Sequence, residues 1–329
     1  MKTFSRRTAI RMVASAIGSS AILGGSVRAT SYPSKSVRVV IPAAAGGATS
    51  IMARILTDHL QAAMGEPFVA DYKGGGAGLI GVDAVAKAPH DGYTLLLTYG
   101  GPVGSGLALF KSMPFDPFRD LTPIARVAEV QLVLVTSPNF KGYSLSRLIE
   151  YARSNPDKLT AAINSYGSMG HLLTEQFRLD NNIKITPIPY KGSSQALPDL
   201  AGGSVDICID PIPSMQGLIK GGRVFPIAVS GSKRSELLPD VPTFTELGVP
   251  NMLATTWYAL YAPAGTSQEI VQALATETEK ILANADVKDL MVKAGGVVNF
   301  APPAQLAAFM REEADKWGRI AKTAGMQPE

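Results

Sequence analysis

The hydrophobic pattern of residues 37–64 predicts a strand, a loop and a helix in succession. Residues 37–41 are an apolar run of strand length, and residues 42–50 are nearly all small. From residue 51 apolar side chains recur at helical spacing, and Gly65 follows at a position that favours a helix C-cap. The apolar helix face consists of Ile51, Ile55, Leu56, Leu60, Ala63 and Met64. A loop of small residues therefore leads directly into the first turn of a helix.

Strand-like and helix-like patterns alternate along most of the chain. Further apolar runs of strand length lie at residues 67–72, 93–99, 131–136, 159–163, 185–190, 205–210, 225–230 and 257–262. One helical pattern ends near residue 88, and another begins after Ser144. Further helical patterns lie at residues 170–179, 195–200, 214–220, 267–283, 287–293 and 303–324. Residues 100–127, rich in Gly and Pro, have little periodicity and are interpreted as a crossing segment. The alternation predicts an α/β fold with a parallel sheet covered by helices on both faces.

Two irregular passages, near residues 120–130 and 240–256, bracket a middle block of strands and helices. We therefore expect two lobes, each a sheet flanked by helices. Residues 30–128 and 254–329 would form lobe 1, and the inserted residues 129–253 would form lobe 2. Two crossings make a hinge, and a ligand would lie in the cleft between the lobes.

Residues 1–29 have the pattern of an export signal peptide. Basic residues precede an apolar run at 12–23, and Val27-Arg28-Ala29 is a plausible signal-peptidase site. The apolar run is too short and too rich in Gly and Ser to span a bilayer. Arg6 and Arg7 resemble the start of a twin-arginine signal. We expect a periplasmic protein exported by the Sec or the twin-arginine route.

Removing this signal changes the charge of the protein. The whole chain has a formal net charge of +4, and residues 1–29 carry five Lys and Arg with no Asp or Glu, so the remainder carries −1. This nearly neutral charge gives no support for nucleic-acid binding. Cys208 is the sole cysteine, which excludes an intrachain disulfide. Its apolar neighbours predict a buried small side chain rather than a nucleophile.

The loop before the first helix is a candidate anion site. The first backbone N–H groups of a helix lack helical partners, and the helix dipole favours negative charge there. Gly46 and Gly47 permit a close backbone approach, and Thr49 or Ser50 can cap the helix or contact a ligand. The alternative is a tight strand-to-helix turn with an ordinary cap.

A second glycine-rich segment resembles a dinucleotide-binding motif without its acidic partner. Gly76, Gly78 and Gly81 match G-x-G-x-x-G, which also requires an acidic residue at the end of the next strand. That strand, at residues 93–99, does not end in Asp or Glu, so we expect no cofactor. No set of His, Cys and carboxylate residues has metal-ligand spacing, so we expect no metal.

Residues 164–171, with the sequence Asn-Ser-Tyr-Gly-Ser-Met-Gly-His, form a second candidate loop between a strand and a helix. A ligand with two polar ends could be held by the first loop at one end and by this loop at the other. The competing interpretation is an exported hydrolase with Ser168 as nucleophile and His171 nearby. The G-x-S-x-G motif is absent, and this spacing suits helix capping better than catalysis. We therefore expect no catalytic residue and no enzyme.

Six short motifs run in order through nearly the whole mature chain. They are Val40–Gly47, Lys73–Gly78, Asp91–Leu96, Pro189–Gly192, Leu237–Thr243 and Tyr261–Thr266. Together they resemble the Bug (Bordetella uptake gene) family, the solute-binding proteins of tripartite tricarboxylate transporters. The resemblance implies a two-lobed type II periplasmic-binding-protein fold, a small carboxylate ligand captured by lobe closure, and two integral membrane transporter subunits as partners. We expect a monomer.

The resemblance also implies which residues bind the ligand, largely through backbone amides and bridging waters. They are Ala45, Gly46, Gly47, Thr49 and Ser50 on one side of the cleft, and Ser165, Tyr166, Gly167, Ser168, His171 and Asp210 on the other. Ser50 stands where family members commonly have Asp, which argues against an amino-acid ligand. Tyr166 replaces a small or amide residue, and its ring could stack on an aromatic acid or cover an aliphatic one. An aromatic or aliphatic mono- or dicarboxylate is expected, and a ligand-presenting subunit of a sensor system is a further alternative.

Overall fold

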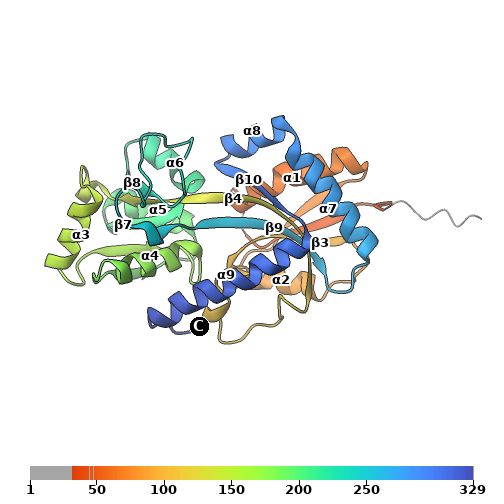
Figure 1. The fold of residues 1–329 in the computed structure, drawn as a ribbon, viewed down its shortest axis with the longest axis horizontal. Coiled ribbons are helices and arrows are strands. Elements are labelled where there is room, and N and C mark those ends of the chain that lie inside the picture. Colours follow the sequence, from red (N-terminus) through yellow and green to blue (C-terminus); the bar gives the residue numbers. More distant parts are fainter. Residues whose placement is uncertain (1–31, 44, 47, 329) are drawn as a thin grey trace, which may run out of the picture.

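A computed structural model describes residues 32–43, 45–46 and 48–328. Within this part of the chain, ten strands form one continuous sheet with the order β2-β1-β3-β9-β4-β7-β5-β6, while β10 and β8 both pair with β4. Helices gather around the two ends of the sheet, and β4 and β9 run between them (Figure 1). The export signal expected at residues 1–29 lies outside the described residues. None of the helices described is long and apolar enough to cross a membrane.

The first lobe, as named here, surrounds β1 (Val37–Ile41), β2 (Phe68–Tyr72) and β3 (Thr94–Tyr99). Strand β1 lies between β2 and β3 and pairs in parallel with both, whereas β9 (Thr255–Pro263) is antiparallel to β3. Helices α1 (Ala48–Met64), α7 (Gln268–Ala283) and α8 (Ala285–Lys293) cover one face. Helix α2 (Leu79–Ala86) covers the other face. Strand β1 is buried on both faces because its alternate side chains, such as Val39 and Val40, enter two different cores.

The second lobe surrounds β5 (Thr160–Ile163), β6 (Thr186–Pro189) and β7 (Ile207–Pro211), which are mutually parallel. Its other elements are α3 (Leu145–Ser154), α4 (Met169–Asp180), α5 (Ser193–Gly202), α6 (Ile212–Lys220) and β8 (Phe225–Val229). Helices α3 and α4 pack on one face, and α5 and α6 pack on the opposite face. The predicted burial of Cys208 is confirmed, since its side chain lies in the core beneath α5 and α6.

One long strand, β4 (Leu121–Thr136), connects the two lobes. From Leu121 to Gln131 it pairs with β9, and from Leu132 to Thr136 it pairs with β7 and β8. The interpretation of residues 100–127 as irregular was therefore wrong for the last part of that segment. Two register shifts against β9 explain the error, because bulges break the two-residue period that marks a strand.

The sheet is mixed rather than purely parallel, because β4 and β9 run against their neighbours. Strand β10 (Gly296–Ala301), for which no prediction was made, is antiparallel to β4. It is largely half-exposed and includes Asn299, so its pattern lacks the apolar run that identified the other strands.

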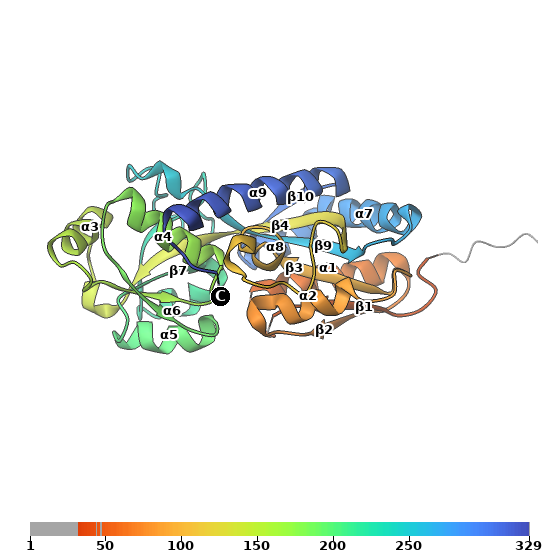
Figure 2. The same ribbon diagram turned by 90° about the horizontal axis from the view of Figure 1, so that it is seen from below.

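Helix α9 (Pro303–Thr323) packs against both lobes. Leu306 and Met310, near its start, enter a core of the first lobe, while Trp317 and Ala321, near its end, enter a core of the second lobe. Figure 2 shows α9 extending along the molecule from the first lobe to α4. The division into residues 30–128 plus 254–329 and residues 129–253 stays a prediction.

Candidate functional site

The first loop presents open backbone at the start of α1. Ala45 and Gly46 are exposed, whereas Gly47 lies outside the described residues. The N–H of Gly46 donates to Ser50 Oγ over 2.8 Å, so the Ser50 hydroxyl folds the loop back onto the helix. Gly46 has a φ of 92°, a left-handed conformation that a glycine adopts without strain. The combination exposes the loop backbone while holding its shape.

Thr49 connects the first loop to the centre of the sheet. Its side chain hydrogen-bonds the hydroxyl of Tyr258, which lies on β9 and is only 1% exposed. Burial raises the pKa of Tyr258 well above its usual value, so the hydroxyl stays protonated and can act as a hydrogen-bond donor. Tyr258 was not predicted as part of this site, because it is far from Thr49 along the chain and only the fold brings the two together.

The glycines of the dinucleotide-like motif have a packing role. A Cβ atom at Gly81 would lie 2.7 Å from the carbonyl oxygen of Lys73 and 2.8 Å from Pro42 Cβ. Gly78 has a φ of 94°, and a Cβ there would lie 3.2 Å from Tyr99 Oη. These glycines let α2 approach the end of β1 closely, which accounts for the motif without a cofactor.

The second loop begins α4 with a serine cap. Ser168 Oγ accepts a hydrogen bond from the backbone N–H of His171 over 3.2 Å. The Nδ1 atom of His171 in turn accepts from the N–H of Gly167 over 3.3 Å. Burial lowers the pKa of His171 to about 4, so its imidazole is neutral at pH 7. Ser168 therefore bonds the His171 backbone rather than its imidazole, an arrangement typical of a cap and not of an activated nucleophile.

Tyr166 joins the second loop to the end of the chain. Its hydroxyl donates to the carbonyl oxygen of Gln327 over 2.5 Å, and its ring centroid lies 4.8 Å from that of His171. Ser165, beside it, is half-buried and accepts the Ser168 N–H on its carbonyl over 3.1 Å. The residues that were expected to bind the ligand in this loop are thus close together in space. Their contact with a ligand stays a prediction.

Asp210, at the end of β7, connects three segments of the second lobe. Its carboxylate is 5% exposed and accepts from Ser193 Oγ over 2.8 Å. Asn164 and Ser214 also hydrogen-bond it, at the end of β5 and in the first turn of α6. Burial raises the pKa of Asp210 to about 6, and the three hydrogen bonds partly oppose this shift. Ser193 and Ser214 were not predicted, although a serine in the first turn of a helix is a recognisable sequence signal.

The two lobes touch on either side of these loops. A Cβ at Gly106, which follows β3, would lie 2.8 Å from the carbonyl oxygen of Gly167. A Cβ at Gly295, before β10, would lie 2.6 Å from Pro213 Cγ and 2.9 Å from Leu237 Cδ1. The negative charge of Asp210, on the second lobe, also contributes to the raised pKa of Tyr258, on the first lobe.

A buried serine holds the two crossings together. Ser230 Oγ accepts from the N–H of Leu132 over 2.9 Å and donates to the carbonyl of Ala254 over 2.7 Å. The Ser230 backbone also bonds both residues, its N–H donating to Leu132 and its carbonyl accepting from Ala254. Leu132 and Ala254 lie where β4 and β9 pass between the lobes, so Ser230 links the two crossings.

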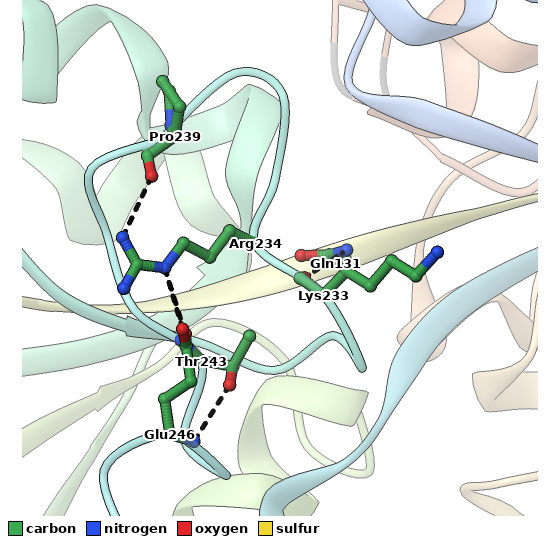
Figure 3. A network of polar contacts seen from close by, with 6 residues as sticks. All are labelled: Gln131, Lys233, Arg234, Pro239, Thr243 and Glu246. Carbon is green, nitrogen blue, oxygen red and sulfur yellow. Dashed lines mark hydrogen bonds and ion pairs between the residues drawn. The ribbon is translucent and has the colours of Figure 1, made fainter.

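The segment after Ser230 folds over the crossing strand. Gln131 Nε2 donates to the carbonyl of Lys233 over 3.2 Å, and the Arg234 guanidinium pairs with the Glu246 carboxylate at 3.0 Å. Figure 3 shows Gln131 on β4 beside Lys233, and to their left Arg234, which contacts Pro239 and Glu246. The Leu237–Thr243 motif, part of the family resemblance, belongs to this segment.

The groups available at the site are backbone amides, hydroxyls, a neutral imidazole and one buried carboxylate. Among residues 32–43, 45–46 and 48–328, no group of three or more His, Cys, Asp and Glu residues is placed to hold a metal ion. This set suits recognition of an anion by hydrogen bonds at a helix N-terminus.

Comparison with known proteins identifies the family. Residues 52–326 match the model of the family described as tripartite tricarboxylate transporter family receptor. The chain belongs to this family. Protein BugT of Bordetella pertussis is 38% identical over 300 residues, which cover 91% of this chain and 92% of BugT. The resemblance to the Bug family is thereby confirmed.

Solved structures of this receptor family have the same fold. R. palustris Rpa4515, solved with adipate, is 34% identical with a TM-score of 0.86 and covers 91% of this chain and 100% of its own. The periplasmic binding protein BugD is 32% identical with a TM-score of 0.81 and the same coverage. MatC from Rhodopseudomonas palustris, solved with bound malate, is 30% identical with a TM-score of 0.79, covering 88% of this chain and 99% of its own. The predicted two-lobed binding-protein fold is confirmed.

Proposed function

We propose that this chain is a periplasmic receptor that binds a small organic carboxylate between its lobes and delivers it to a tripartite tricarboxylate transporter. The observation that carries the proposal is the exposed backbone of Ala45 and Gly46 at the start of α1. The chain belongs to a family of transporter receptors, and two solved relatives hold adipate and malate. The N–H groups in the first turn of a helix lack helical partners, and together with the helix dipole they favour a carboxylate at such a position.

The proposed contacts divide between the two lobes. On the first lobe, Ala45, Gly46 and Gly47 would contact the ligand through the loop backbone, with Thr49 and Ser50 beside them; the Gly46 N–H would have to leave Ser50 Oγ to donate to the ligand. On the second lobe, the far end of the ligand would meet the neutral imidazole of His171 and its surroundings. The second-lobe residues proposed are Ser165, Tyr166, Gly167, Ser168, His171 and Asp210. The crossings linked by Ser230 would act as a hinge that lets the lobes close over the ligand and desolvate these hydrogen bonds, which strengthens them.

A mono- or dicarboxylate of small size is the proposed ligand class. The relatives solved with adipate and malate favour an aliphatic chain over a ring. The hydroxyl of Tyr166 is bonded to Gln327, which fixes its ring against His171 and supports a lid rather than a freely stacking ring. We propose that the chain is exported to the periplasm. There it would be a monomer, and its partners would be two integral membrane transporter subunits.

A thermal-shift screen of residues 30–329 tests the binding function. Aliphatic and aromatic mono- and dicarboxylic acids are the ligands, and amino acids are the controls. A ligand at about a hundred times its Kd stabilises the folded state by about 2.7 kcal/mol, which gives a visible rise in Tm. We expect a rise with one or more acids and none with the amino acids. A folded protein that responds to no acid would contradict the proposal.

A further inference from the structure

The C-terminal segment, residues 324–328, lies against the second loop and α4. The carbonyl of Gln327 accepts from the Tyr166 hydroxyl over 2.5 Å, and the carbonyl of Ala324 accepts from Arg178 Nη2 over 3.1 Å. Between them, Met326 packs against the second-lobe core. Residues 324–328 therefore contact the second loop and α4 through these two hydrogen bonds and the packing of Met326.

Tyr166 continues these contacts into the site. Its ring lies against the ring of His171, whose Nδ1 accepts the N–H of Gly167 over 3.3 Å. Gly167 has a φ of 69°, a left-handed backbone conformation that glycine adopts with little strain. Glycine adopts several other conformations as easily, so its own backbone does not fix the loop. A loop of this kind needs external contacts to hold a single conformation.

A cavity of about 470 Å³ borders Tyr166, His171, Arg178 and Met326. The hydrogen bond to Gln327 is one of the contacts that hold the Tyr166 ring beside this cavity.

Helix α9 attaches the C-terminal segment to the first lobe. The carboxylate of Glu313 accepts from Nε1 of Trp257 on β9 and from Nε1 of Trp317 on α9, each over 3.1 Å. Burial raises the pKa of Glu313, and its hydrogen bonds to the two indoles oppose that shift. The end of the chain thus reaches the second loop from a helix that is fixed to the central sheet.

We propose that the C-terminal segment is a positioning element of the ligand site, in which the Gln327 carbonyl holds Tyr166 and thereby the second loop in the conformation that binds ligand. This inference rests on the proposed function of the cleft. Tyr166 is then a positioning residue that acts through His171 and Gly167. Preorganisation of this kind raises affinity because the loop need not be ordered when the ligand arrives.

Two variants remove the contact from opposite sides. Tyr166→Phe keeps the ring and loses the hydroxyl, whereas deletion of residues 327–329 removes the carbonyl that accepts from it. Deletion of residues 328–329 alone is the matched control, because Gln327 keeps a terminal oxygen within reach of Tyr166. Circular dichroism and Tm establish that each variant folds.

Ligand affinity, measured by calorimetry with the acid found in the thermal-shift screen, is the first readout. Apparent affinity falls in proportion to the fraction of protein in the competent conformation, so we expect about a three- to tenfold loss in Tyr166→Phe and in the 327–329 deletion. The double variant should lose no more than either alone, because both break one contact. The control deletion should bind like the wild type. Unchanged affinity in both single variants, or additive losses in the double variant, would overturn the inference.

Hydrogen exchange on the ligand-free protein is the second readout. The 327–329 deletion should speed exchange of the Gly167 amide and leave the amides of β1 unchanged. Equal exchange at Gly167 in wild type and deletion would overturn the inference without any ligand. If the wild type binds no acid, while the deletion still exchanges the Gly167 amide faster than the wild type, only the proposed function is contradicted.

Discussion

Ser193 donates its hydroxyl to the buried carboxylate of Asp210 over 2.8 Å. The bond joins the first residue of α5 to the end of β7, and Asn164 and Ser214 add two further segments to the same carboxylate. A single acid thus joins the ends of β5 and β7 to the starts of α5 and α6. Burying this carboxylate costs stability only when it is ionised, so the free energy of unfolding depends on pH.

Asp210→Asn should remove a pH dependence of stability between about pH 4 and pH 6. The pKa of Asp210 rises from 3.8 when unfolded to about 6 when folded, so the folded state binds more protons in this range. The wild type therefore loses stability as pH rises through 6, by roughly 3 kcal/mol from this group at most. Urea unfolding at several pH values, with exposed Asp289→Asn as control, measures the difference. Parallel curves for wild type and Asp210→Asn would contradict it.

His171 should give the opposite dependence. Its pKa falls from 6.5 to about 4 on folding, so its contribution to stability is complete above pH 6.5 and is lost as pH falls through 4. NMR of the imidazole C–H protons should show a neutral ring at pH 5.5, with ligand affinity unaffected by this group between pH 7 and 5.5. A midpoint near 6.5 for His171 in the folded protein would refute this.

Gly46→Val should weaken carboxylate binding at least about tenfold, equivalent to about 1.4 kcal/mol. The side chain would obstruct the exposed amides, and the left-handed φ of 92° would be strained. Gly142→Val is the matched control, because Gly142 also has a positive φ, 77°, with nothing within 4 Å of an added Cβ. Gly142 precedes α3, away from both loops. Calorimetric titration of both variants distinguishes an effect of backbone strain, which both share, from a loss of ligand contacts, which only Gly46→Val should show. If the two variants bind the ligand with equal affinity, the carboxylate lies elsewhere.

Ser230→Ala should destabilise the protein by about 2–4 kcal/mol, because it leaves two buried backbone groups without their partner. These are the N–H of Leu132 and the carbonyl of Ala254. Ser137→Ala is the control, since Ser137 Oγ is also buried but has no hydrogen-bond partner within the described part of the chain. Chemical unfolding should show little loss for Ser137→Ala. A similar small loss for Ser230→Ala would show that the link between the crossings does not depend on its hydroxyl.

Elements with an uninterrupted local pattern were predictable. The apolar run at residues 37–41 coincides with β1, and the expected caps Ser144 and Ser168 accept from the N–H groups of Arg147 and His171. These features depend on neighbours within a few residues, and the sequence displays them directly. Only the last part of β4, from residue 131 onwards, was predicted as a strand. The bulges in its first part shift the alternation of side chains.

The first loop was also evident from composition, since small residues before an amphipathic helix leave its amides accessible. The sequence alone also indicated the family through the order of its weak motifs, which the family match confirms. It could not indicate the partner of the Tyr166 hydroxyl, because Gln327 is 161 positions away.

The same limit applies to the contacts of Asp210 with Ser193, of Ser230 with Leu132 and Ala254, and of Thr49 with Tyr258. Each joins segments that are distant in the chain and adjacent only after the sheet has formed. Local pattern determined most strands and helices and the exposed loop before α1, because hydrophobic periodicity and capping act over a few residues. The tertiary structure decided which side chains meet, because long-range packing sets the burial and hydrogen bonding of each polar group.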